Sequence, residues 1–176
     1  MSRRASSPKL PAPPISKRRF RHASKAIDAV ERERSNFQHW RLEKSIVELC
    51  LENDHEPLTN GHIDLFCNFG DTSAIFEVKA CPPYDIAGPI RLAVAQLFEY
   101  RYLYRNNLKP NVKLCVVSER RPRSGYEWTI GYLESLGIGL IWRNDGDDGL
   151  NCNDFTKGLL DDLFPQMRTW ESLPIM

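Results

Sequence analysis

Two acidic residues and a lysine have the types and the spacing of a site for chemistry at a phosphate ester. Asp64 lies near the start of the segment 61–79, and Glu77-Val78-Lys79 ends it thirteen positions further on. Carboxylate oxygens are the ligands that Mg²⁺ prefers, and two or three acids suffice because the ion keeps several waters. Bound Mg²⁺, or Mn²⁺, activates water and clamps phosphate oxygens. The expected metal ligands are Asp64, Glu77 and the Val78 carbonyl.

A strand hairpin is the element that must bring these side chains together. Apolar and polar residues alternate over 62–69, Gly70-Asp71 is a plausible turn, and 73–80 has the pattern of the return strand. Alternate residues of a strand share a face, so Glu77 and Lys79 project to the same side. There Lys79 is expected to orient the attacking water and to neutralise developing charge. The alternative is a solvated Glu and Lys at an exposed strand end, since an acid-x-Lys tripeptide arises by chance about once in a chain of this length.

The segment after the hairpin predicts a helix over 90–104, with apolar residues on one broad face. Gln96 and Tyr100 stand four residues apart, so they lie on one side of that helix and can point together at the site. There they would hydrogen-bond a phosphate or steady Lys79. The simpler interpretation is a rim glutamine beside an ordinary amphipathic core tyrosine.

Taken together, Asp64, Glu77-Val78-Lys79 and Gln96-x-x-x-Tyr100 resemble the motifs of the PD-(D/E)XK nuclease superfamily, in particular its RecB-like members. The resemblance covers roughly residues 40–142. It implies an α/β protein with a restriction-endonuclease-like αβββαβ core, in which a mixed sheet is flanked by helices and extended by a further C-terminal helix and strand. It also implies catalytic roles for Asp64, Glu77, Lys79, Gln96 and Tyr100. The sequence departs from the family at Ile63, where many members have proline, and lacks the clustered cysteines of Cas4-like members.

Members of this superfamily often add a glutamate from the first helix to the metal site. Glu43 and Glu48 are the candidates here, and the spacing that the family has between this helix and the Asp strand favours Glu43. For either of them a surface glutamate is the alternative. His62 is a further candidate near the metal, or simply an exposed residue.

The remaining elements are predicted from periodicity and from Gly and Pro positions. Helices are expected over 26–33, 37–51, 126–136 and near 159–163, and strands over 112–118 and 137–142, with residues 55–60 supplying one more strand. Strands that alternate with helices imply parallel neighbours and a sheet covered on both faces.

Charge is distributed unevenly along the 176 residues. Residues 1–25 hold eight of the 24 Lys and Arg residues and no acid, so the rest of the chain has a net charge of −7. Residues 1–24 are also rich in Pro and Ser and are expected to form a disordered basic arm ahead of a single domain over 25–176. The arm is a plain solvated tail, a clamp on phosphates through residues such as Arg18 and Arg19, or an organellar transit peptide.

Other basic side chains are candidates for phosphate contacts in a nucleic-acid substrate: Arg91, Arg101, Arg120, Arg121 and Arg123. Tryptophans are expected either in the core, as favoured for Trp128 and Trp142, or stacked on bases.

No apolar stretch is long enough to span a bilayer, and five scattered cysteines disfavour a disulfide framework, which fits a cytoplasmic protein. The expected function is a Mg²⁺-dependent nuclease acting on DNA, with RNA not excluded, in phage defence, mobile-element biology or repair. It would act alone, as a homodimer or as a subunit of a larger complex. The alternatives are a non-catalytic nucleic-acid-binding or assembly subunit of the same fold and an unrelated α/β protein with a basic arm.

Overall fold

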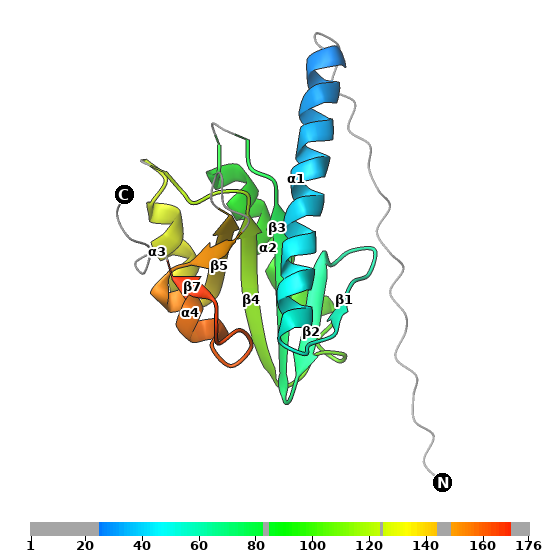
Figure 1. Cartoon of the computed structure of the whole chain (residues 1–176), viewed down its shortest axis with the longest axis vertical. Helices are drawn as coiled ribbons and strands as arrows, with labels where there is room; N and C mark the ends of the chain where they lie inside the picture. Colours follow the sequence, from blue (N-terminus) through cyan, green and yellow to red (C-terminus); the bar gives the residue numbers. More distant parts are fainter. Residues whose placement is uncertain (1–24, 83–84, 124, 144–148, 170–176) are drawn as a thin grey trace.

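A computed structural model of the chain describes residues 25–82, 85–123, 125–143 and 149–169 (Figure 1). The predicted basic arm, with Arg18 and Arg19, lies outside these ranges. The elements follow in the order α1 (Lys25–Glu52), β1 (Pro57–Leu58), β2 (Leu65–Phe69), β3 (Thr72–Lys79), α2 (Ala87–Leu103), β4 (Asn111–Ser118), α3 (Trp128–Ser135), β5 (Ile138–Arg143), β6 (Leu150–Cys152), α4 (Asp154–Leu160) and β7 (Arg168–Thr169).

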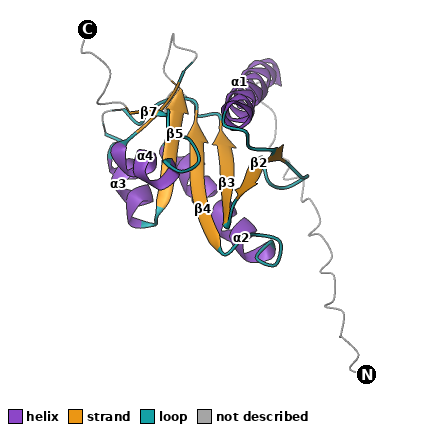
Figure 2. Cartoon of the chain, turned by 60° about the horizontal axis from the view of Figure 1, so that its bottom comes forward, coloured by secondary structure: helices purple, strands orange, loops and turns teal. Residues whose placement is uncertain are grey.

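All seven of these strands belong to one mixed sheet, whose spatial order is the order of the sequence. Strands β1, β2 and β3 form an antiparallel meander, and β3, β4 and β5 run parallel through the helical crossovers α2 and α3. Strand β6 then pairs antiparallel with β5, and β7 parallel with β6. The predicted mixed α/β sheet flanked by helices is therefore confirmed (Figure 2).

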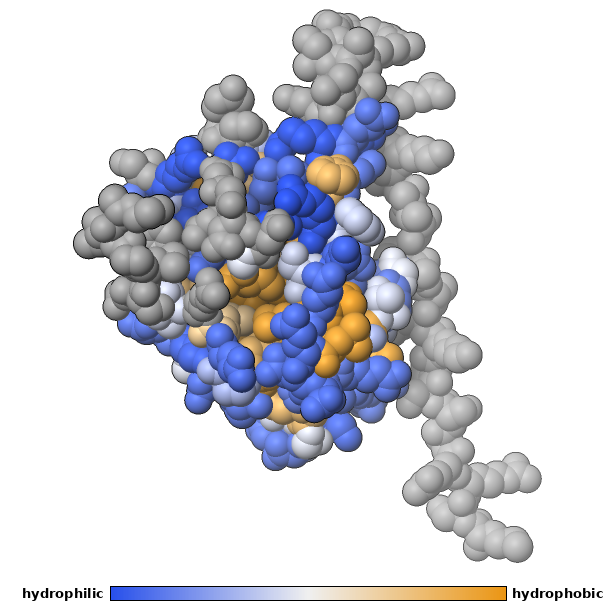
Figure 3. Space-filling view, viewed as in Figure 1, coloured by the Kyte–Doolittle hydropathy of each residue, from blue (hydrophilic) through white to orange (hydrophobic). Residues whose placement is uncertain are grey.

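The two faces of β3 are covered by different helices. Phe76 and Val78 pack with Leu42, Ile46 and other buried residues of α1 and α4, whereas Ile75 packs on the opposite face among residues of α2 and α3. Glu77 and Lys79 alternate with Phe76 and Val78, so they belong to the face that α2 covers. On the α1 side, apolar surface gathers between α1 and α4, while the surface above it is mainly hydrophilic (Figure 3).

The hairpin forms at the predicted turn, where Gly70 adopts φ 52°, a conformation that favours glycine. Its first strand is shorter than predicted and begins at Leu65 instead of residue 62. Asn60 is the physical reason, because its Oδ1 accepts hydrogen bonds from the backbone N–H groups of His62 and Ile63, both at 2.8 Å. This local turn ends just before Asp64 and sets its position against β3.

Several other predictions need correction. The two helices expected over 26–33 and 37–51 are one continuous helix, since no Gly or Pro interrupts Lys25–Glu52. The last helix covers Asp154–Leu160, earlier than expected, and begins at Asn153, whose side chain accepts from the Thr156 N–H. Trp142 is buried as predicted, but Trp128 is 48 % exposed and the prediction of a core residue was wrong.

Candidate functional site

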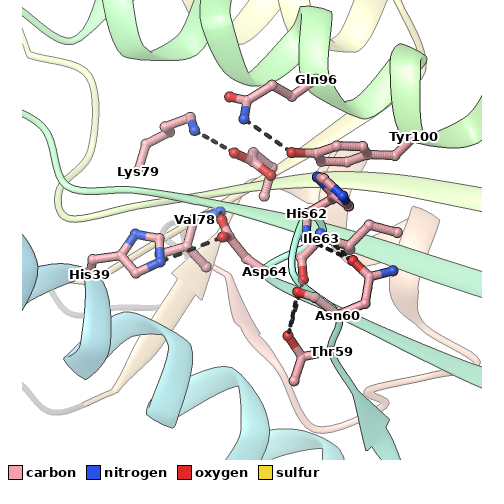
Figure 4. A network of polar contacts seen from close by, with 11 residues as sticks. His39, Thr59, Asn60, His62, Ile63, Asp64, Val78, Lys79, Gln96 and Tyr100 are labelled. Atoms are coloured by element: carbon pink, nitrogen blue, oxygen red, sulfur yellow. Dashed lines mark hydrogen bonds and ion pairs between the residues drawn. The ribbon is translucent and has the colours of Figure 1, made fainter. Parts of the chain in front are cut away.

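The predicted site residues meet at the carboxyl end of β3. Lys79 is the last residue of that strand, and Asp64 directly precedes β2, whose first residue pairs with Phe76. Figure 4 shows how α1 reaches the site from one side with His39 and α2 from the other with Gln96 and Tyr100. Four elements thus contribute side chains to one small region.

Glu77 is the most unusual of these residues because its carboxyl group is buried, with the residue only 1 % exposed. Its Oε1 accepts a hydrogen bond from Lys79 Nζ, whereas its Oε2 has no hydrogen-bond partner in the described part of the chain. Burial raises the pKa of Glu77 to about 7; the contact with Lys79 opposes this rise and the charge of Asp64 adds to it. A buried carboxylate with an unsatisfied oxygen is costly, so a cation at this position would relieve the cost.

Asp64 is held in place by both of its carboxylate oxygens. Its Oδ2 accepts a hydrogen bond from the Val78 N–H at 2.8 Å, and its Oδ1 lies 3.6 Å from Nε2 of His39. Burial alone would raise the pKa of Asp64, but the contacts with His39 and the Val78 N–H outweigh burial and lower it. The same contact with Asp64 raises the pKa of His39. Asp64 is therefore ready to act as an anionic ligand.

His39 is the site residue that the sequence analysis missed. It belongs to α1, 25 positions before Asp64, and no local pattern links the two. The only available signal was its spacing of four from Glu43, which places both on one side of the helix.

Gln96 and Tyr100 adopt the arrangement expected from their spacing. Gln96 Nε2 donates a hydrogen bond to Tyr100 Oη at 3.1 Å. Tyr100 is 7 % exposed, and burial, followed by the negative charge of nearby Glu77, raises its pKa. The pair therefore lies against the face of β3 that carries Glu77.

Of the two candidates for a third acid, Glu43 is the nearer to the site. Its charge contributes to raising the pKa of His39, whereas the Glu48 side chain is 56 % exposed and pairs with Lys44 at 3.5 Å. The third candidate, His62, is exposed, and its backbone N–H is bound by Asn60.

Whether these residues fit a divalent cation depends on the acids and on their unsatisfied atoms. Within the described ranges, no three His, Cys, Asp or Glu side chains gather closely enough to hold a metal ion by themselves. Mg²⁺ needs only one or two protein carboxylates besides its waters and the substrate oxygens. The anionic Asp64 and the unpartnered Oε2 of Glu77 meet that requirement, so the donor set fits Mg²⁺ or Mn²⁺ and does not fit a closed structural metal site.

Three of the predicted phosphate-binding arginines lie just after β4, at this end of the sheet. Arg120, Arg121 and Arg123 follow β4 and line a small cavity with Tyr126 and with Asp85 and Ile86, which directly precede α2. Arg120 donates to Glu119 at 3.0 Å, and Arg34 of α1 binds the same carboxylate at 2.8 Å.

Two further arginines lie on α2. The Arg91 guanidinium is 5.4 Å from the centre of the exposed Trp128 ring. Arg101 is exposed in the last turn of the helix, and within the described ranges its side chain makes no hydrogen bond or ion pair with the other predicted site residues.

All five cysteines are buried free thiols. No helix in the described ranges is long and apolar enough to cross a membrane. Comparison of the chain with protein-family models, with curated proteins and with solved structures finds no match.

Proposed function

We propose that this protein is a metal-dependent nuclease that hydrolyses phosphodiester bonds of DNA, with RNA as a further substrate class to be tested. One observation carries the proposal. The buried carboxylate of Glu77 has one oxygen that no described residue contacts, beside Lys79 and on the same strand end as the anionic Asp64. Lys79 satisfies only one of the two oxygens, and burying the other is unfavourable unless a cation or a donor also binds it, which supports a binding role over a purely structural one.

The order and direction of the strands support a restriction-endonuclease-like core. An initial helix, an antiparallel three-stranded meander and a helical crossover to a parallel strand follow one another in the order expected for αβββαβ. Helix α3 and strand β5 then supply the additional helix and strand. This order brings Asp64 and Glu77 to one end of a hairpin, where the proposed chemistry needs them.

Each residue has a role that follows from its position. Asp64 and Glu77 would hold the cation, which supplies water activation and charge neutralisation at the phosphate when bound. Lys79 contacts Glu77 and would donate to the attacking water or to a phosphate oxygen, stabilising the negative charge that grows there. His39 fixes the orientation of Asp64 and lowers its pKa. Gln96 holds the Tyr100 hydroxyl, which would position a phosphate oxygen on the α2 side.

The decisive experiment measures cleavage of single- and double-stranded DNA and RNA with Mg²⁺, with Mn²⁺ and with EDTA. We expect metal-dependent cleavage that falls by about 10²–10³-fold in Lys79→Ala. Asp64→Asn is expected to have an effect of at least that size. The matched controls are Lys109→Ala and Asp71→Asn, which change a lysine and an aspartate at the opposite end of the same hairpin region, where Asp71 binds Asn111.

Two results would refute the enzyme. One is the absence of cleavage on every substrate together with no Mg²⁺ or Mn²⁺ binding by calorimetry. The other is cleavage that persists unchanged in Lys79→Ala and Asp64→Asn, which points to a contaminating nuclease. Nucleic-acid binding without cleavage or metal binding would support the non-catalytic subunit instead.

A further inference from the structure

A second hollow lies next to the candidate metal site, on the other side of α1. It has a volume of about 250 Å³ and is lined by five residues of α1 and by Arg143 at the end of β5: Trp40, Arg41, Lys44, Ser45, Glu48 and Arg143. We refer to it as the Trp40 pocket. Its volume is slightly below the range of about 300–1,000 Å³ that encloses a drug-sized ligand, so it suits one base or one nucleotide.

The lining of the Trp40 pocket is aromatic and predominantly cationic. Among the described residues that line it, Arg41, Lys44 and Arg143 are basic and Glu48 is acidic. Glu48 is engaged by Lys44 at 3.5 Å, but both side chains are more than half exposed, and such ion pairs contribute little stability. A phosphate group can therefore compete for Lys44.

Trp40 supplies the aromatic surface of the pocket. It is 54 % exposed, which is unusual for a large apolar side chain, and Lys44 Nζ lies 5.7 Å from the centre of its ring. The neighbouring Phe37 is also 54 % exposed, with the Arg41 guanidinium 5.7 Å from its ring. Exposed aromatic rings next to cations are the combination by which proteins bind unpaired bases, stacking each base while neutralising its phosphate.

The position of the pocket relative to the metal site fits a continuous strand. Trp40 follows His39, which contacts Asp64, so the two sites share one turn of α1. Arg143 and Lys79 end the parallel strands β5 and β3, with β4 between them. Two strand spacings separate these ends by roughly 10 Å, with Arg143 on the α1 side of the sheet and Lys79 on the α2 side, so the substrate strand would pass over the end of the sheet between them.

We propose that the Trp40 pocket binds an unpaired base of the substrate strand, close to the bond that is cleaved. This inference rests on the proposed function and adds its substrate class: single-stranded nucleic acid, or a single-stranded region next to a duplex. A base inside a duplex is stacked on its neighbours and cannot place its face on Trp40. The cations beside the ring bind the phosphate of the same nucleotide.

The test measures binding separately from cleavage. Fluorescence anisotropy in EDTA compares a labelled single-stranded (dT)20, a 20-base-pair duplex and an oligonucleotide with abasic positions. We expect the wild type to prefer (dT)20, and Trp40→Ala and Trp40→Leu to weaken its binding by about tenfold or more, since stacking contributes about 1–3 kcal/mol per base. Trp40→Phe should keep most of the affinity. Arg143→Ala and Lys44→Ala should reduce the dependence of binding on salt.

Tyr102→Ala is the matched control, because Tyr102 is 66 % exposed on α2, on the other side of the sheet. Thermal unfolding of each variant shows whether it is folded. If Trp40→Ala does not fold, Trp40→Leu serves in its place, because leucine keeps a large apolar side chain at this position but has no aromatic ring. Equal affinity of the wild type and Trp40→Leu for (dT)20 would overturn the inference, as would equal binding of the abasic strand. If the wild type cleaves DNA and Trp40→Leu binds (dT)20 as tightly as the wild type, only this inference is refuted. If binding depends on the bases and on Trp40 but no substrate is cleaved, only the proposed nuclease activity is refuted.

Discussion

The two ends of β3 differ in whether their buried polar groups have hydrogen-bond partners. At the hairpin end, the buried Ser73 hydroxyl donates to Asn68 Oδ1 at 2.5 Å and accepts from the Lys109 N–H at 2.9 Å. At the carboxyl end, Oε2 of Glu77 and, just beyond β4, Oε2 of Glu119 are buried without a hydrogen-bond partner in the described residues. Satisfied groups hold a fold together, while unsatisfied ones indicate a binding partner that completes them.

The largest effect should come from removing the charge of Glu77. Glu77→Gln is expected to reduce metal-dependent cleavage by about a thousandfold, because a neutral amide does not replace a carboxylate as a cation ligand. Initial rates on a labelled single strand measure this loss. Ser73→Ala, at the other end of the strand, should leave the cleavage rate unchanged. A similar loss of rate in both variants would show that the two ends of β3 do not differ in function.

The second prediction concerns the stability of the metal-free protein against pH. Burial raises the pKa of Glu77 from 4.5 to about 7 in the folded chain, so the folded state holds a proton that the unfolded state has already released. The free energy of unfolding should therefore fall as pH rises from about 4.5 to 7, by roughly 1–3 kcal/mol.

Urea unfolding at several pH values in EDTA measures this loss. Glu77→Gln should flatten this part of the profile, and Mg²⁺ should restore the stability of the wild type at pH 8 but not that of the variant. A pH dependence that is identical in wild type and Glu77→Gln would contradict the assignment to this carboxyl group.

The third prediction tests the hairpin end. Ser73→Ala should lower the free energy of unfolding by about 1–3 kcal/mol, because the Lys109 N–H and the Asn68 side chain lose the buried hydroxyl as their partner in a partly buried position. Chemical denaturation measures this cost at any pH, with or without Mg²⁺. The hydrogen bond between Asp71 and Asn111 is exposed, so Asp71→Ala should lower the free energy of unfolding by less than about 1 kcal/mol.

The smallest effect should come from His39, which acts through Asp64. His39→Ala is expected to weaken Mg²⁺ binding by about tenfold, as the loss of a residue that orients a ligand typically does. The pKa of Asp64 should rise in the variant, so the acid limb of the cleavage profile should move to higher pH. Calorimetry and a pH–rate profile measure the two effects, and an unmoved acid limb would show that His39 does not tune Asp64.

Local patterns were sufficient to predict the hairpin and the central helices and strands. Alternation before Gly70 predicted β2, the turn and the apolar run after it predicted β3, and the spacing of Gln96 and Tyr100 predicted their shared helix face. The start of β2 was wrong, because a single side chain, Asn60, caps the backbone there. Strands β6 and β7 were missed because they have three and two residues, too few for any periodicity.

Contacts between distant segments were beyond the reach of local patterns. His39 joins the site because α1 packs its later turns on the sheet, and nothing near His39 in the sequence encodes that packing. Trp128 was expected in the core from its residue type alone. Its side chain is exposed instead and lies beside Arg91 of α2, a helix that is separated from Trp128 in the sequence by strand β4.

The continuity of α1 has a consequence for its motions. The helix extends beyond the sheet at its N-terminal end (Figure 1), and among its described side chains only Leu42, Ile46 and Cys50 are buried. Its last three turns are therefore anchored by apolar packing, whereas its earlier turns are joined to the sheet by polar contacts, such as those of Arg34 with Glu119 and the Cys81 carbonyl, and their backbone hydrogen bonds are more open to water. Amide hydrogens should exchange quickly before His39 and slowly after Leu42. A bound strand in the Trp40 pocket should move that boundary toward the N-terminus, which makes hydrogen exchange along this one helix a direct record of substrate occupancy.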